Sequence, residues 1–327
     1  MIYKLVKKNI MRTAILLATI FMTLNISCAT GQKNSTSNEP DMNNQLKSGT
    51  NIYFENKTIN ADLNFTNLLP PINESNGINR CYINSAITFR QCTFKGKISG
   101  YVTESSGKST MTYFQKSVSF IDCIFDDDVN LRGAIFAAPV NFQGCSFVKK
   151  ADFQECQFYT DAFFNETKYR EEAFFQNSVF MKKMILMNAR FESNVYFQNS
   201  VFYFDAQFSN AEFQKYADFT VCTFQMGCFF NYCKFQQQAI FNSSVFSNRF
   251  EILKITANKV ELRKCYFGFV PKLMQSDFSE LLDFSSSHFA MGIPVLKDIT
   301  TKEILASEIT SCNKNYTSEE FLKASGR

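Results

Sequence analysis

Large apolar side chains recur along residues 118–249 at spacings that alternate between five and six without a break. Twenty-four positions from Phe120 to Phe246 follow this rule, and all are Phe except Leu131, Tyr169 and Leu186. A small or apolar residue precedes each of them by two, and residues two apart lie on one side of an extended chain. Steps of five and six place Phe on no single helical face, so the pattern predicts short strands and not helices.

The repeating unit has 11 residues and occurs in twelve successive copies across 118–249. A further copy stands at 87–97, and an insertion at 98–116 separates it from the main run. If two units make one coil, residues 22 apart stack in neighbouring coils about 4.8 Å apart. Outward charges 22 apart alternate in sign, which supports this period. They are Asp127 and Asp128, Lys149 and Lys150, Glu171 and Glu172, and in a second column Asp161, Lys183 and Asp205.

Asparagine recurs two residues after an inward apolar residue, where the chain has to turn. Asn177 would stack on Asn199, and Asn188 on Asn210. Asparagine tolerates left-handed backbone geometry and can hydrogen-bond along a ladder. The sequence therefore predicts left-handed turns at these positions.

Segments such as ADFQE, AEFQK, ADFTV, CTFQM and CSFVK resemble the pentapeptide-repeat family, whose usual unit is Ala-(Asp/Asn)-Leu-x-x. The resemblance covers 118–249 without interruption and, more loosely, 50–97 and 250–290. It implies an all-β fold, a right-handed quadrilateral β-helix with Phe or Leu along its axis and the small residue at the crowded corner. This chain adds one residue to every second unit, so a coil would take about 22 residues and not 20.

The β-helix is predicted over residues 51–290, and its ends have to be closed because a bare terminal coil exposes core and strand edges. Residues 51–85 are expected to form the first coil and its cap. Residues 291–327 are expected to cap the far end with short helices, because capping-box pairs Thr300/Glu303 and Thr317/Glu320 occur there.

The N-terminus reads as an export signal over residues 1–27. A basic segment precedes an apolar run of about 14 residues, which is short of the ~20 that span a bilayer as a helix. LNISC at 24–28 resembles a bacterial lipobox, which would make Cys28 the acylated residue. Cleavage after Ala29 or an uncleaved anchor are the alternatives. The polar segment 28–50 is then a flexible tether, and the predicted location is the cell envelope, lipid-anchored, with secretion or the periplasm as the alternative.

The net charge of the chain restricts the classes of partner that it could bind. Lys4, Lys7, Lys8 and Arg12 account for the formal +4, and from residue 28 onward 30 basic residues balance 30 acidic ones. Nucleic-acid surfaces need clustered Lys and Arg, so no nucleic acid is expected. The predicted partners are the membrane, through the N-terminal lipid, and an envelope protein or a second copy of the chain.

Ten cysteines follow Cys28, and most occupy small inward positions, where Cys acts as a small buried residue. Cys123 and Cys145 are 22 apart and should lie one above the other, at a spacing that would suit a disulfide. The cysteine spacings are those of the repeat, with no histidine nearby, so a zinc site is not expected.

No catalytic, cofactor or metal site is predicted. His288 is the single histidine, and its surroundings, SSSHFAM, match no catalytic motif. The acidic runs 126–128 and 171–172 read as solvated turns and not as the carboxylate pair of a glycosidase.

The outward position between the small and the aromatic residue is apolar in several copies. Phe163 would lie under Ile185, and Phe174 under Tyr196, giving short apolar patches on two opposite faces. Such patches often mark an interaction surface. The alternative is that the insertion 98–116 or the terminal segments cover them, or that they reflect β-propensity alone.

Three functions fit this sequence to different degrees. The first is a non-enzymatic envelope lipoprotein that serves as a rigid scaffold or protein-interaction surface. The second is the topoisomerase-binding DNA mimicry that the resemblance implies, which the export signal and neutral charge disfavour. The third is a β-helical polysaccharide-acting enzyme, which would need acids and bases gathered in one groove.

Overall fold

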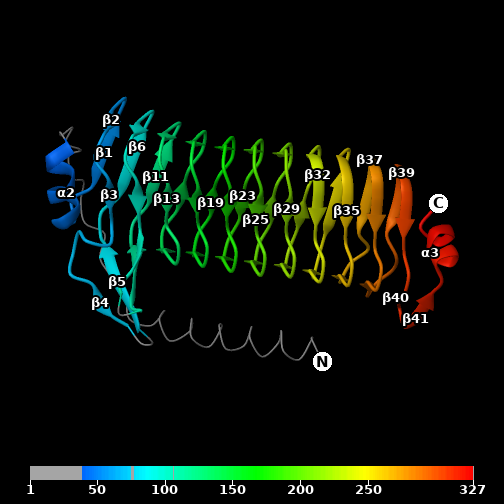
Figure 1. Ribbon diagram of the computed structural model, residues 1–327. Coiled ribbons are helices and arrows are strands. Elements are labelled where there is room, and N and C mark those ends of the chain that lie inside the picture. The colour runs from blue at the N-terminus through cyan, green and yellow to red at the C-terminus, as the bar shows by residue number, and fades with distance from the viewer. Residues whose placement is uncertain (1–38, 75–76, 106, 327) are drawn as a thin grey trace. The chain divides into compact units, whose positions relative to one another are not determined.

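The computed structural model describes residues 39–74, 77–105 and 107–326. They form a β-solenoid of about 9 turns with about 22 residues per turn, so the predicted all-β fold and coil length are confirmed (Figure 1). The predicted signal peptide and Cys28 lie outside the described residues.

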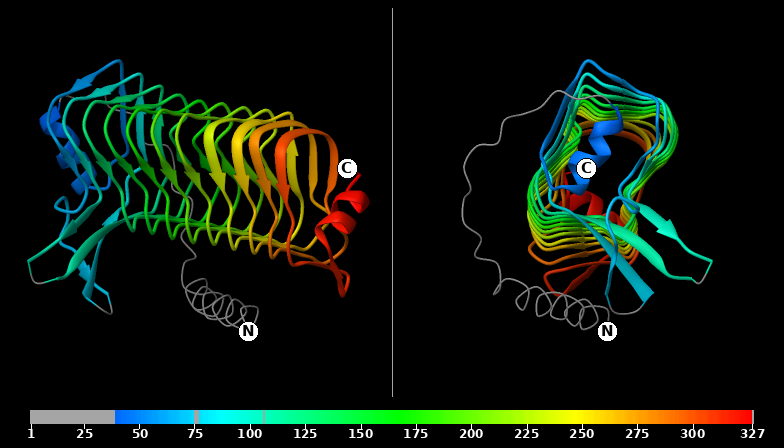
Figure 2. Two further views of the ribbon diagram at one scale, coloured as in Figure 1. Left: turned by 45° about the vertical axis from the view of Figure 1, so that its right-hand side comes forward. Right: turned by 90° about the vertical axis from the view of Figure 1, so that its left-hand side faces the viewer.

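One coil passes through four short strands. The coil that begins at β17 (Ala151–Asp152) continues through β18 (Gln157–Phe158), β19 (Ala162–Phe163) and β20 (Lys168–Tyr169). It then returns to β21 (Ala173–Phe174), which pairs in parallel with β17 and sets Ala173 beside Ala151, 22 residues earlier. Seen along the stack, successive coils superpose as one closed outline (Figure 2).

The strands therefore fall into four columns, numbered here in the order in which the chain meets them. The first contains β1 (Ile52–Glu55), β6 (Ile87–Arg90), β11 (Val118–Ile121), β15 (Val140–Asn141), β19, β23 (Met184–Ile185), β27 (Ala206–Gln207), β31 (Cys228–Phe229) and β34 (Phe250–Leu253). The second contains β2 (Thr58–Ile59), β7 (Thr93–Phe94), β12 (Ile124–Phe125), β16 (Ser146–Phe147), β20, β24 (Arg190–Phe191) and β28 (Glu212–Phe213).

The remaining two columns complete the coil. The third contains β3 (Leu63–Asn64), β8 (Ile98–Ser99), β13 (Val129–Asn130), β17, β21, β25 (Val195–Tyr196) and β29 (Ala217–Asp218). The fourth contains β5 (Ile78–Ile83), β10 (Ser109–Phe114), β14 (Ile135–Phe136), β18, β22 (Val179–Phe180), β26 (Val201–Phe202), β30 (Thr223–Phe224), β33 (Val245–Phe246), β36 (Tyr266–Phe267), β38 (His288–Phe289) and β40 (Ile309–Ser311).

Toward the C-terminus long strands run across several columns. They join the first three columns into one 27-stranded sheet, while the fourth column belongs to a separate 14-stranded sheet. These long strands are β32 (Lys234–Ile240), β35 (Thr256–Glu261), β37 (Lys272–Asp283) and β39 (Val295–Leu305).

Two corners in each coil turn through a left-handed residue. Asn177, Asn188, Asn199 and Asn210 have φ of 58°, 58°, 61° and 61°, which confirms the turns expected from asparagine. The backbone N–H of the following small residue bonds back to the carbonyl of the aromatic residue three positions earlier, as from Ser200 to Phe197 at 3.1 Å. The short step of five residues is therefore a tight turn.

The core consists of stacked phenylalanine rings. Phe202 lies 4.7 Å from Phe224 with an interplanar angle of 4°, and Phe180 lies 4.9 Å from Phe202 at 2°. Rings of different columns meet edge to face, as Phe208 meets Phe219 at 81°. Both arrangements are favourable for aromatic quadrupoles, and each of these side chains is fully buried.

Both ends of the solenoid carry a helix. At the N-terminal end α2 (Glu39–Lys47) buries Met42 and Leu46, so residues 39–47 of the expected tether are helical. That expectation was wrong for this part because two apolar residues four apart provide a face that packs on the first coil.

At the C-terminal end α3 (Ser318–Ala324) begins at the capping box of Thr317 and Glu320, as predicted, and packs Phe321 on Phe284 and Phe289. The helix expected at Thr300 and Glu303 is wrong. These residues lie in β39, which pairs along β37 and extends the coils beyond residue 290. Burial of Leu296 and Ile299, on either side of the left-handed Asp298, outweighs the local capping signal.

Two hairpins project from the N-terminal coils (Figure 2). β4 (Ile72–Asn73) pairs antiparallel with β5, and β9 (Tyr101–Thr103), inside the insertion, pairs antiparallel with β10. The buried Arg80 guanidinium fixes the first hairpin to the solenoid, because it pairs with Glu74 at 3.3 Å and donates to Gly133 O at 2.9 Å. A third hairpin, β40 with β41 (Lys314–Tyr316), closes the other end.

Candidate interaction surface

The outward position of each strand has a structural role when it is Asp or Asn. Asp152 Oδ1 accepts from the backbone N–H of Gln154 at 2.9 Å, and Asn141 Oδ1 accepts from that of Gln143 at 2.8 Å. These Asx bonds satisfy an amide at the start of the tight turn. Burial raises the pKa of the Asp152 carboxyl. An apolar residue at this position gives up the bond.

The four apolar residues predicted as an interaction surface occupy that same position. Phe163 pairs with Ile185 in the first column, and Phe174 pairs with Tyr196 in the third, with ring centroids 5.4 Å apart and nearly parallel. The predicted stacking is therefore present. The structure brings these residues together as two half-buried pairs on opposite faces and not as one patch.

The insertion does not lie over these pairs. Its strands β8, β9 and β10 pair with β3, β5, β13 and β14 or with each other, in coils that precede Phe163 and Phe174. In the next coil Gln207 and Asp218 take the same outward positions and end each pair. Each apolar pair is therefore short and bounded by polar side chains.

The second column is charged. Glu212 accepts from Lys234 Nζ at 2.7 Å and from Arg190 Nη1 at 3.1 Å, and Lys168 pairs with Glu192 at 3.0 Å. The hydrogen bond from Lys234 lowers the pKa of Glu212. Exposed pairs of this kind contribute about 0–1 kcal/mol each.

The acidic runs form ladders with lysines of the adjacent coil, as the 22-residue period predicts. Lys149 pairs with Glu171 at 3.0 Å and Lys150 with Glu172 at 3.6 Å. The second expected column behaves differently, because Asp161 Oδ1 accepts from the backbone N–H of Lys183 at 3.0 Å and not from its ammonium group.

The fourth column, opposite the charged one, is the part of the surface that sequence reasoning missed. Its outward residues carry no formal charge in the regular coils. The sequence contains the signal for this column. The outward residues of the second and fourth columns take the same position in successive 11-residue units, and the 22-residue period separates the charged set from the uncharged set. These uncharged residues are Gln157, Val179, Val201, Thr223 and Val245, whereas Ile135 takes the same position and is buried.

No disulfide joins any of the ten described cysteines in this structure. Cys123 and Cys145 lie in adjacent coils, as expected, and the thiol of Cys145 beside it raises the pKa of Cys123 to about 12. The disulfide between them stays a prediction. Cys156, Cys222 and Cys233 each donate to a backbone carbonyl 25 residues earlier, as Cys156 Sγ does to Leu131 O at 3.0 Å.

His288 lies in the fourth column. It stacks on Tyr266 with ring centroids 5.4 Å apart, and its Nδ1 lies 2.7 Å from Thr310 Oγ1. Both neighbours belong to the regular stacking of the column. Among the described residues, no group of three or more His, Cys, Asp or Glu side chains is placed to hold a metal ion.

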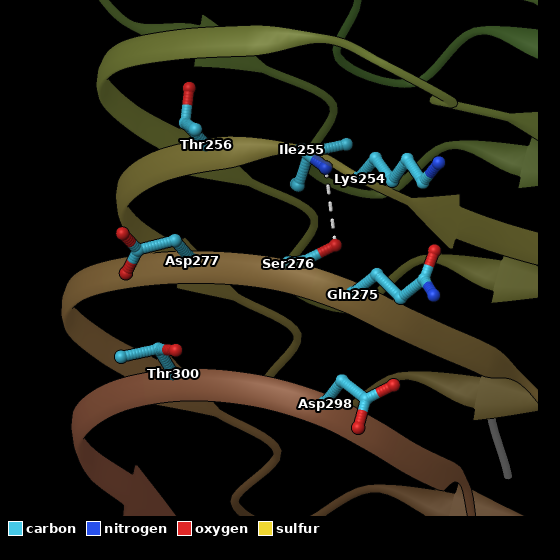
Figure 3. A pocket seen from close by; sticks show the side chains of 8 residues that line it. All are labelled: Lys254, Ile255, Thr256, Gln275, Ser276, Asp277, Asp298 and Thr300. Atoms are coloured by element: carbon cyan, nitrogen blue, oxygen red, sulfur yellow. Dashed lines mark hydrogen bonds between the residues drawn. The ribbon is translucent and has the colours of Figure 1, made fainter.

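An open polar groove of about 310 Å³ follows the corner between the first and second columns in the last coils (Figure 3). Lys254, Gln275 and Asp298 stand there at left-handed positions of successive coils. Ser276 Oγ accepts from the backbone N–H of Ile255 at 3.1 Å and donates to Met274 O at 2.8 Å, so this hydroxyl maintains the corner.

The repeats identify the architecture independently of the geometry. Residues 120–168 and 175–223 match the family model for pentapeptide repeats, in 9 copies. Within these two segments the solenoid carries pentapeptide repeats. Nothing among curated proteins or solved structures matches the chain. In the part of the chain that the structure describes, none of the helices has the length and apolar character that a membrane span requires.

Proposed function

We propose that this pentapeptide-repeat protein is a non-enzymatic scaffold of the bacterial cell envelope, anchored by a lipid on Cys28, which presents its outward side chains to a protein partner. One observation carries the interaction role. The pairs Phe163/Ile185 and Phe174/Tyr196 occupy outward positions where Asp or Asn would supply an Asx bond. A neutral hydrogen bond of this kind contributes about 0.5–1.5 kcal/mol, and an apolar residue at this position forgoes it.

The anchor is supported by the order of basic segment, apolar run and cysteine in residues 1–28. Ten residues separate Cys28 from the start of α2 at Glu39. At full extension ten residues span at most about 35 Å. A lipid on Cys28 would therefore hold the first coil close to the membrane.

Metabolic labelling with radioactive palmitate tests the anchor. The wild-type chain should incorporate label and fractionate with membranes, whereas Cys28→Ala should do neither. Label that persists in Cys28→Ala would contradict the anchor.

Crosslinking in intact envelopes tests the interaction role. Phe163→Ser and Tyr196→Ser should each reduce a specific crosslinked product, whether the product contains another protein or a second copy. Gln207→Ser is the matched control, because Gln207 takes the outward position next in line in the first column. Equal crosslinking in all three variants would contradict the role of the apolar pairs.

The observed charges favour neither alternative function. Acids and bases alternate along the second column and the acidic corners, whereas a DNA mimic requires a surface of one sign. The alternating acids and bases also differ from the two opposed carboxylates that cleave a glycosidic bond.

A further inference from the structure

Four of the most exposed large apolar side chains lie in a single line. Phe204, Met226, Phe269 and Met291 are 41 %, 44 %, 48 % and 61 % exposed. Each stands two residues after an inward Phe of the fourth column, and the parallel register of that column stacks their positions. Asn248 takes the same place in the one intervening coil. We call these four residues the apolar ridge.

The ridge is convex. It follows the corner at which the chain leaves the fourth column for the first, so its side chains point away from the solenoid and line no groove. On one side it continues into the uncharged outward residues of the fourth column, including Val201 and Val245. Tyr203, next to Phe204, is half-buried.

The exposed charges beside the ridge are positive. Lys182, Lys183 and Arg249 are exposed, and Lys182 Nζ lies 4.5 Å from the centre of the Phe204 ring. The nearby carboxylates Asp161 and Asp205 are only partly exposed. Each accepts a backbone N–H of the next coil, from Lys183 at 3.0 Å and from Gly227 at 3.0 Å.

We propose that the apolar ridge docks on a lipid bilayer that contains anionic phospholipid. Long apolar side chains with flanking Lys and Arg are the features that seat a protein in the interface between headgroups and acyl chains. Each cation near an anionic membrane surface adds to the attraction. A second copy fits less well, because two convex ridges offer each other little area and would bring their cations together.

Docking of the ridge fixes an orientation. The ridge runs along the stacking direction, so the solenoid would lie along the membrane with its charged second column turned away. This goes beyond the proposed scaffold function, and it requires no lipid on Cys28. An anchor there would raise the local concentration of the ridge at the bilayer.

The absence of tryptophan from the sequence gives a direct test. Phe204→Trp places a reporter on the ridge, and Tyr216→Trp places one at the diagonally opposite corner, where Tyr216 is 47 % exposed. The unacylated full chain carrying either substitution is mixed with vesicles of phosphatidylcholine and phosphatidylglycerol whose acyl chains are brominated. Met291→Trp is a second ridge reporter, in case Phe204→Trp disturbs folding.

The expected result is position-dependent quenching. Fluorescence of the ridge reporters should fall about twofold with brominated lipid and shift to the blue, while that of Tyr216→Trp should be unchanged. Vesicles of phosphatidylcholine alone should quench the ridge reporters less, because the cations then lack their partner.

Three outcomes would overturn the proposal. They are equal quenching at both corners, no quenching at the ridge, and a blue shift of the ridge reporter without lipid that accompanies dimerisation in sedimentation. These outcomes leave the palmitate test of Cys28 unaffected, and a failed palmitate test leaves this measurement standing.

Discussion

The hydroxyl of Ser178 donates a 2.7 Å hydrogen bond to the carbonyl oxygen of Phe153, 25 residues earlier. It also accepts from the backbone N–H of Cys156 at 3.1 Å. Ser200 and Cys222 repeat the donation to Phe175 and Phe197. The small inward position therefore supplies a hydrogen-bond donor between coils as well as a small volume, which explains why Ser and Cys alternate there.

Replacing Ser178 by Ala should lower the free energy of unfolding by about 1–3 kcal/mol, because Phe153 O and Cys156 N are buried and lose their partner. Ser178→Cys keeps a donor and should cost less. Urea unfolding followed by circular dichroism measures both. Equal losses in the two variants would show that only the volume of the side chain matters.

A substitution at Val221 should stabilise the protein, in contrast to the loss expected at Ser178. Its φ is 59°, a region that is unfavourable for a β-branched side chain, and Asn199 holds the equivalent position one coil earlier with φ 61°. Val221→Asn should raise the free energy of unfolding by about 1 kcal/mol. The reciprocal change Asn199→Val should lower it. Unfolding midpoints that move the other way would contradict this account of the turn.

Stability should fall in acid partly through Glu212. Its pKa is lowered in the folded protein, chiefly by the hydrogen bond from Lys234. A lowered folded pKa means that the contribution is present above the ordinary value of 4.5 and is lost as the pH falls through the folded value. Glu212→Gln should remove this part of the loss below pH 4.5, and a midpoint measured against pH detects it. Unchanged pH dependence would indicate that the ion pair is not formed in solution.

Thiol reactivity should separate the cysteines. In a Cys28→Ala background at pH 8, an aromatic disulfide reagent should modify only Cys312 among the described residues, because it alone is exposed. Burial raises the pKa of Cys233 and Cys265 to about 12, which also suppresses their thiolates.

The same assay tests the predicted disulfide. After denaturation without reductant all ten described thiols should react if they are free. Two fewer reactive groups, with one regained in Cys123→Ser because Cys145 is then free, would show a bridge from Cys123 to Cys145.

The regular part of the fold follows from the sequence because each coil repeats the same local requirement. Phe at the axis, a small residue at the corner and Asn177 or Asn199 in a left-handed turn are each visible in one 11-residue unit. The helix predicted at Thr300 and Glu303 was wrong because their structure depends on contacts distant in sequence. Their strand is fixed by pairing with the previous coil, as Leu296 pairs with Leu273, 23 residues earlier.

The surface was harder to predict than the core. The pairing of Phe163 with Ile185 follows from the period alone, because both take the same outward position two units apart. The apolar ridge does not, since Phe204 and Met226 lie outside the small-x-aromatic unit and align with Phe269 only because one coil is a residue shorter. Exposure at a convex corner depends on the three-dimensional path of the chain.

The helices α2 and α3 occupy the two ends of the stack, while each coil between them touches only the coil before and the coil after. Duplication or deletion of one in-phase 22-residue segment would therefore change the length by about 4.8 Å and disturb neither end. Evolution could adjust the span of such a protein in fixed increments. Such a protein can set the distance between the groups bound at its two ends in steps of one coil.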